Sequence, residues 1–161
     1  MNKVFERNAL AHHLAAHRGE ARVVFTNGCY DLLHVGHVRL LQMARALGDI
    51  LVVGVNSDAS VRRLKGDTRP IVGEAERAEV LAALACVSYV TIFDEDTPVE
   101  TIRALRPNVH VKGGDYGPED LPEMPALREI GATVEIFPLV NGSSSTRLIE
   151  RARTAGVDPR G

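Results

Sequence analysis

The sequence is poor in cysteine and has no long apolar run, and these two absences exclude several classes of protein. Its two cysteines, Cys29 and Cys86, lie far apart and form no C-x-x-C pair, so neither a disulfide framework nor a zinc knuckle is supported. The longest apolar run, residues 50–55, is far shorter than the roughly 20 residues that cross a membrane. The first twenty residues carry charges and three histidines in place of an apolar signal core. We therefore expect a cytoplasmic protein that does not act at a membrane.

The sequence also lacks an excess of basic charge. Nineteen lysines and arginines stand against twenty-one aspartates and glutamates, a formal net charge of -2, so there is no surplus to hold a nucleic-acid backbone. Hydrophobic residues at 45% and charged residues at 25% are typical of a globular protein and exclude disorder. The 161 residues suffice for one domain. We expect an N-terminal helical extension laid on the outside over residues 1–20, one main domain over 21–155 and a flexible tail over 156–161.

Apolar runs alternate with helix-length segments, a pattern that predicts an α/β fold with a parallel sheet. Two β-branched runs, at residues 22–26 and 50–55, are typical of central strands covered on both faces. A crossover helix is predicted between them, because apolar residues recur there at helical spacing before Gly48. These apolar residues are Leu40, Met43, Ala44 and Leu47.

Weaker strands and further helices complete the predicted fold. The strands are expected at residues 89–93, 109–112 and 133–137. One helix is predicted at residues 76–85, and another begins at a capping box formed by Thr97 and Glu100, with Pro98 at the first helical position. The whole predicts a Rossmann-like parallel sheet of about five strands with helices on both faces.

The segment between the first strand and the crossover helix carries polar groups suited to chemistry. His34 and His37 lie three residues apart at the start of the helix, where unpaired N–H groups and a partial positive charge favour phosphate. Gly28 lets the backbone approach a ligand, and Gly36 leaves room for a flat base. The carboxyl end of a central strand is also where open α/β sheets usually bind ligands. The sequence therefore predicts an anion site here.

The residues alone leave two other interpretations of the histidine pair open. His34 and His37 fit a structural capping pair, or two ligands of a metal site, although no third Cys, His or carboxylate lies nearby at ligand spacing. The P-loop and the G-x-G-x-x-G patterns are both absent, which argues against a Walker-type kinase and a nicotinamide enzyme. Lysine is scarce, with three lysines against sixteen arginines, so Lys65 and Lys112 are of interest.

The sequence His34-Val35-Gly36-His37, following Thr26-Asn27-Gly28, resembles the His-x-Gly-His signature of the cytidylyltransferase-like nucleotidyltransferase superfamily. Other segments resemble the adenylyltransferase module of ADP-heptose synthase, and the resemblance covers about residues 20–152. They lie at residues 55–60, 64–67, 69–70, 76–77, 111–116 and 143–146. The resemblance implies the HxGH nucleotidyltransferase fold over residues 21–155.

The resemblance implies that ATP and D-glycero-β-D-manno-heptose 1-phosphate react to give ADP-heptose and pyrophosphate, by in-line attack on the α-phosphate. It implies Mg²⁺ carried by the nucleotide rather than by a protein metal site, and a homodimer. Because the chain is too short for a fused kinase, we expect another protein to supply the heptose 1-phosphate. One alternative is a CTP-dependent cytidylyltransferase for glycerol 3-phosphate or a similar small phosphate. Another is a non-catalytic nucleotide-binding module.

The resemblance also assigns roles to individual residues. His34, His37 and Lys65 are the predicted catalytic residues, and Lys65 is expected in a loop from which its ammonium folds over the phosphates. The hydroxyl run at 143–146 is expected to cap the last helix and to form a second phosphate cradle. The predicted ATP-binding residues are Thr26, Asn27, Gly28, Gly36, Lys112, Gly113, Asp115, Ser144, Ser145 and Thr146. The predicted sugar-phosphate contacts are Asp31, Arg69 and Arg77.

Overall fold

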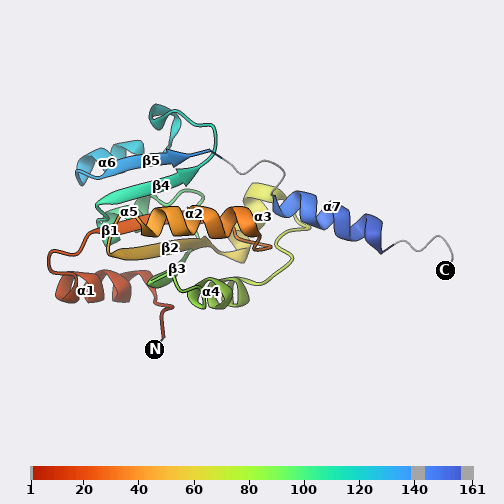
Figure 1. Cartoon of the computed structure of the whole chain (residues 1–161), viewed down its shortest axis with the longest axis horizontal. Helices are drawn as coiled ribbons and strands as arrows, with labels where there is room; N and C mark the ends of the chain where they lie inside the picture. Colours follow the sequence, from red (N-terminus) through yellow and green to blue (C-terminus); the bar gives the residue numbers. More distant parts are fainter. Residues whose placement is uncertain (1, 139–143, 157–161) are drawn as a thin grey trace.

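The computed structural model describes residues 2–138 and 144–156 and contains one five-stranded sheet (Figure 1). The strands are β1 (Val23–Gly28), β2 (Ile50–Asn56), β3 (Tyr89–Phe93), β4 (Val109–Gly113) and β5 (Thr133–Phe137). All neighbouring strands pair in parallel, in the order β3-β2-β1-β4-β5. The prediction of a parallel sheet of about five strands is confirmed, and each expected strand is present.

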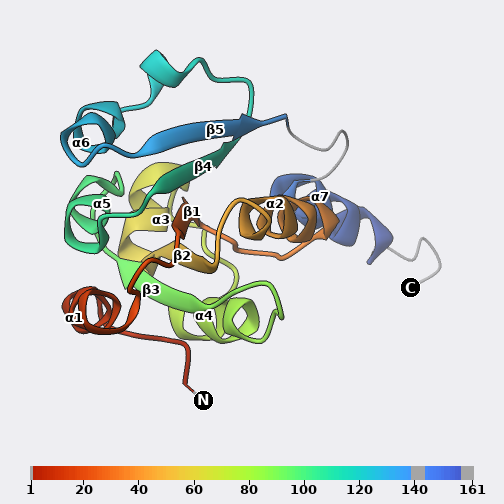
Figure 2. The same ribbon diagram turned by 60° about the vertical axis from the view of Figure 1, so that its left-hand side comes forward.

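Helices cover both faces of this sheet, as predicted (Figure 2). The helices are α1 (Arg7–His17), α2 (Val35–Arg45), α3 (Asp58–Lys65), α4 (Glu74–Ala82), α5 (Val99–Leu105), α6 (Met124–Glu129) and α7 (Ser145–Ala155), with a 3₁₀ turn, η1, at Pro118–Asp120. On one face, apolar residues of α2 and α4 pack against the sheet; on the other, those of α1, α5 and α6 do so. Alternate residues of β1 point to opposite faces of the sheet: Val24 packs in the core beneath α2 and α4, and Phe25 packs in the core beneath α1, α5 and α6.

Two local predictions are wrong. Residues 58–65, including Lys65, form helix α3 rather than a loop, and the Ser57 side chain caps it by accepting the Ser60 backbone N–H. The capping box predicted at Thr97 does not form, because the carbonyl of Pro98 accepts the first helical hydrogen bond, from the Ile102 N–H at 2.8 Å. Helix α5 therefore begins one residue later than expected and has no side-chain cap.

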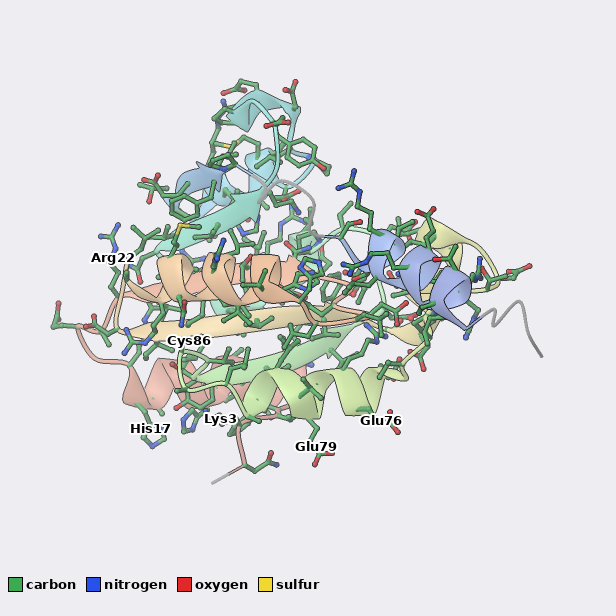
Figure 3. The ribbon with its side chains drawn as sticks, turned by 45° about the vertical axis from the view of Figure 1, so that its right-hand side comes forward. Lys3, His17, Arg22, Glu76, Glu79 and Cys86 are labelled. Carbon is green, nitrogen blue, oxygen red and sulfur yellow. The ribbon has the colours of Figure 1, made fainter. Side chains whose placement is uncertain are left out.

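The N-terminal segment is part of the core rather than an outside extension. Leu10 and Leu14 of α1 are buried against the sheet, and Val4 forms a parallel bridge with Val90 of β3. The Lys3 ammonium donates to the carbonyls of Leu84 and Val87 at 3.2 and 2.8 Å (Figure 3). Most of the predicted tail at 156–161 lies outside the described residues. Within the described part of the chain, no helix has the length and apolar character to span a bilayer.

The strand order determines where a ligand site lies. The chain passes from β1 through α2 to β2 on one side of β1, whereas β4 and β5 are added on the other side. The order therefore reverses between β1 and β4, and such a reversal leaves a crevice at the carboxyl ends of the strands. The loop from β1 to α2 and the end of β4 both meet this crevice.

Candidate active site

Helix α2 begins with a reciprocal cap made by the two histidines. His34 is the N-cap residue, and its Nδ1 accepts the Gly36 backbone N–H at 3.2 Å. The Nδ1 of His37 accepts the His34 backbone N–H at 3.3 Å. The two rings are stacked, with centroids 3.8 Å apart and planes 25° apart. The capping interpretation of the pair is therefore confirmed as its local structural role.

This cap fixes the tautomer of both rings. A nitrogen that accepts a hydrogen bond carries no proton, so a neutral ring must hold its proton on Nε2. Burial lowers the pKa of His34. Burial, the charge that His34 carries when it is protonated, and the charge of Lys65 lower the pKa of His37 to about 4. At neutral pH the site thus contains two uncharged imidazoles, each with an Nε2–H donor.

A cavity of about 230 Å³ lies beside these rings. It brings together eight predicted residues from four parts of the fold: His34, Gly36, His37, Lys65, Gly113, Ser144, Ser145 and Thr146. Leu40, Met43 and Pro138 complete the described lining. The spacing of Leu40 and Met43 predicted only the crossover helix, whereas in the structure both also contribute to the cavity wall and Met43 is 38% exposed.

Helix α7 directs a second N-terminus toward the same cavity. Ser144 caps α7, because its Oγ accepts the Arg147 backbone N–H at 3.0 Å. The Ser145 hydroxyl donates to the carbonyl of Leu32 at 2.9 Å, which ties α7 to the loop before α2. Two helix N-termini and the Lys65 side chain therefore surround one cavity, an arrangement that favours a polyphosphate. Ser143, at the start of the predicted hydroxyl run, lies outside the described residues.

The ends of β1 and β4 are joined by polar contacts. The buried Thr26 hydroxyl donates to the carbonyl of Val111 at 2.9 Å, so this hydroxyl is engaged between the two strands. The Lys112 ammonium lies 3.3 Å from Asn27 Oδ1 and 3.1 Å from Glu123 Oε1. Lys112 is therefore held at the strand ends by a carboxylate that the sequence reasoning missed.

Glu123 belongs to a buried polar cluster with His110. Its Oε1 lies 2.9 Å from His110 Nε2, and both side chains are fully buried. Burial raises the pKa of Glu123, but the His110 hydrogen bond and the Lys112 charge outweigh it and bring the pKa to about 2. Burial lowers the pKa of His110. Glu123 is therefore an anion beside a neutral imidazole, and it balances the charge of Lys112.

Five predicted nucleotide contacts do not line the cavity: Thr26, Asn27, Gly28, Lys112 and Asp115. A Cβ at Gly28 would lie 3.1 Å from the ring of Tyr30, so the absent side chain makes room for that ring. Asp115 is exposed and does not line the cavity, although it follows Gly113 closely in sequence. The cavity thus gathers five of the ten predicted ATP-binding residues: Gly36, Gly113, Ser144, Ser145 and Thr146.

Asp31 and Arg69 form a buried ion pair rather than two free contacts. The Arg69 Nε donates to Asp31 Oδ2 at 2.6 Å. The backbone N–H groups of Ile71 and Val72 donate to Asp31 Oδ1 at 2.8 and 2.9 Å. Burial would raise the pKa of Asp31, but these hydrogen bonds and the Arg69 charge lower it. Asp31 therefore anchors the loop that carries Arg69.

The structure points to a different role for Arg77, which the sequence suggested as a sugar-phosphate contact. Its side chain is fully buried, and its three nitrogens donate to the carbonyls of Val72, Cys29 and Asn56 and to Asp58. Because these partners engage every nitrogen, the guanidinium joins the loops after β1 and β2 to α4. We assign Arg77 to the scaffold.

Comparison with known proteins decides the family. The sequence profile described as cytidylyltransferase-like matches residues 25–151, more than half of the chain. The chain belongs to the cytidylyltransferase-like family. A relative named bifunctional protein HldE, from Geotalea uraniireducens, is 55% identical over 96% of this chain and 32% of its own length. Another HldE, from Koribacter versatilis, is 55% identical over 92% of this chain and 31% of its own length. The chain thus spans about a third of the length of the curated relatives it matches.

Solved structures support the same fold. A lipopolysaccharide core biosynthesis protein from Thermoplasma volcanium is 28% identical, with a TM-score of 0.60, over 76% of this chain and 99% of that chain. A pantoate-beta-alanine ligase from Francisella tularensis has a TM-score of 0.61 over 100% of this chain and 80% of its own, and its 12% identity makes it a match of fold alone. The predictions of a Rossmann-like α/β fold and of an enzyme of the nucleotidyltransferase class are confirmed.

Proposed function

We propose that this chain transfers the adenylyl group of ATP to D-glycero-β-D-manno-heptose 1-phosphate, giving ADP-heptose and pyrophosphate. The observation that carries the proposal is the single cavity in which His34, His37, Lys65 and the N-terminus of α7 meet. The nucleotidyltransferase class comes from the family, whereas the two substrates come from the sequence motifs that resemble ADP-heptose synthase. The homodimer and the cytoplasmic location stay predictions.

The proposed reaction requires alignment and charge stabilisation rather than a protein nucleophile. An oxygen of the sugar phosphate attacks the α-phosphorus, a new P–O bond forms, and the bond to the β-phosphate oxygen breaks. The Nε2–H groups of His34 and His37 donate to α-phosphate oxygens as negative charge develops there. The Lys65 ammonium, at the end of α3, neutralises charge on the leaving pyrophosphate.

We propose that Mg²⁺ enters with the triphosphate. Among the residues that the structure describes, no group of three or more His, Cys, Asp or Glu side chains is arranged to hold a metal ion. We therefore assign the ion to phosphate oxygens, without a protein ligand. When bound there, Mg²⁺ neutralises charge on the leaving group.

A pyrophosphate-release panel tests this proposal. It crosses ATP, CTP, GTP and UTP with heptose 1-phosphate, glucose 1-phosphate and glycerol 3-phosphate. We expect the highest kcat/KM with ATP and heptose 1-phosphate. Turnover with CTP and glycerol 3-phosphate, but not with the heptose pair, would replace the proposal with a cytidylyltransferase. Tight ATP binding without pyrophosphate release from any pair would indicate a non-catalytic binding module.

His37→Ala tests the role of the histidine donor. Because its hydrogen bond strengthens as charge develops at phosphorus, we expect kcat to fall about 100-fold or more while the Kd for ATP changes much less. His17→Ala is the matched control, since His17 is an exposed histidine on α1 (Figure 3). Equal losses in kcat and in ATP binding would contradict a role specific to the transition state.

A further inference from the structure

A second cavity, of about 430 Å³, adjoins the histidine cavity and shares Lys65 and Thr146 with it. Its other lining residues come from the loop after α3 and from α7: Thr68, Arg69, Ile149, Glu150 and Arg153. Its volume lies within the range of about 300–1,000 Å³ that is usual for small-molecule sites. The roles assigned above to ATP leave this space unused.

The charges that line the second cavity favour a phosphate ester. Lys65, Arg69 and Arg153 supply three positive charges, and Glu150 is the one carboxylate among the lining residues that the structure describes. Guanidinium groups bind phosphate through paired N–H donors. The Glu150 carboxylate and the Thr68 hydroxyl are groups that hydrogen-bond the hydroxyls of a sugar. The lining thus suits a ligand that carries both a phosphate and hydroxyl groups.

Arg69 lines this cavity, and the protein holds its guanidinium in place. Its side chain is only 11% exposed, and its Nε donates to Asp31 Oδ2 at 2.6 Å. Asp31 is itself fixed by the backbone N–H groups of Ile71 and Val72. The Nη2 of Arg69 is buried and has no hydrogen-bond partner, although buried polar atoms normally have one. The guanidinium is therefore held in place with donor capacity that the protein does not use.

We infer that this second cavity binds the phosphate of the acceptor substrate, a sugar phosphate, with Arg69 and Arg153 as its phosphate-binding residues. The inference rests on the proposed function. Two anionic substrates must approach each other for the reaction, and their repulsion opposes it. Lys65 lines both cavities, so a positively charged side chain lies between the two anionic substrates.

Arg153→Gln is the main test, because Arg153 is exposed on α7 and its replacement leaves the core intact. We expect its KM for the acceptor to rise about tenfold, the low end for a hydrogen bond to a charged group, with little change in KM for ATP. Arg151→Gln is the matched control, an exposed arginine on the same helix that does not line the cavity, and it should leave both constants unchanged. Arg69→Lys should also raise the KM for the acceptor, since lysine keeps the charge but lacks the paired N–H donors of the guanidinium.

The remaining outcomes separate this inference from the proposed function. If Arg153→Gln raised only the KM for ATP, the triphosphate would lie in the second cavity and the inference would be overturned. Unchanged KM values for both substrates in Arg153→Gln would also overturn it. If the wild-type protein releases no pyrophosphate with any acceptor, the proposed function fails, and calorimetry with glucose 1-phosphate as probe still tests the cavity. Weaker binding by Arg153→Gln than by the wild type and Arg151→Gln supports the inference. Equal binding by all three, or no binding to the wild type, overturns it.

Discussion

The low pKa of His37 makes the stability of the protein depend on pH. Burial and neighbouring positive charge bring this pKa to about 4 in the folded chain, against an ordinary value of 6.5. As the pH falls below about 6.5, His37 becomes protonated in the unfolded chain. In the folded chain it becomes protonated only near pH 4. The contribution of His37 to the unfolding free energy is therefore fully present above pH 6.5 and is lost as the pH falls toward 4. Linkage gives a loss of about 2 kcal/mol at pH 5 relative to pH 8.

His37→Asn isolates this contribution, because the Asn Oδ1 can replace Nδ1 as the acceptor for the His34 N–H but does not titrate. Urea unfolding is followed by circular dichroism, since the chain has no tryptophan. Between pH 8 and pH 5, the wild type should lose about 2 kcal/mol more unfolding free energy than the variant. His12→Asn, at an exposed position on α1, should behave like the wild type. Equal losses in the wild type and His37→Asn would refute the reasoning.

Two further predictions concern buried charges. Arg77→Met should lower the unfolding free energy by about 3 kcal/mol, because it removes four hydrogen bonds and leaves Asp58 without its partner. A loss below about 1 kcal/mol, measured by urea unfolding, would contradict the scaffold role of Arg77. Glu123→Gln should weaken ATP binding, measured by calorimetry, because Lys112 loses its ion pair. In a Lys112→Met background the same substitution should have no effect on ATP binding. Additive effects of the two substitutions would show that Glu123 does not act through Lys112.

The sheet could be predicted from the sequence because its signal is local. Residues 22–26 and 50–55 are runs of β-branched and apolar residues, as expected of strands that are buried on both faces. Helix α3 was missed because only Ser60 and Val61 are buried in its eight residues, which leaves no apolar periodicity. Its available signal was Ser57, a residue type that favours the N-cap position.

The roles of the charged residues depend on contacts far apart in the sequence. Arg69 and Arg77 look alike in the sequence, yet Arg77 lies on the face of α4 that also buries Ala78 and Leu81, whereas Arg69 precedes the helix and lines a cavity. Glu123 has no short-range motif, and it reaches Lys112 only because the chain returns from β4 into α6. The motifs around the histidines were found because their spacing along the chain is itself the geometry of the site.

The capping role and the proposed chemistry of the histidines depend on one another. A neutral imidazole has one acceptor and one donor nitrogen. Since the start of α2 occupies both Nδ1 acceptors, each ring presents its Nε2–H away from the helix cap, and the low pKa values keep that polarity fixed at neutral pH. Serine or asparagine at position 34 would cap the helix equally well but would offer no ring donor. The capping role therefore belongs to Nδ1 and the proposed catalytic role to Nε2–H of the same ring, and the cap fixes the direction of the Nε2–H donor.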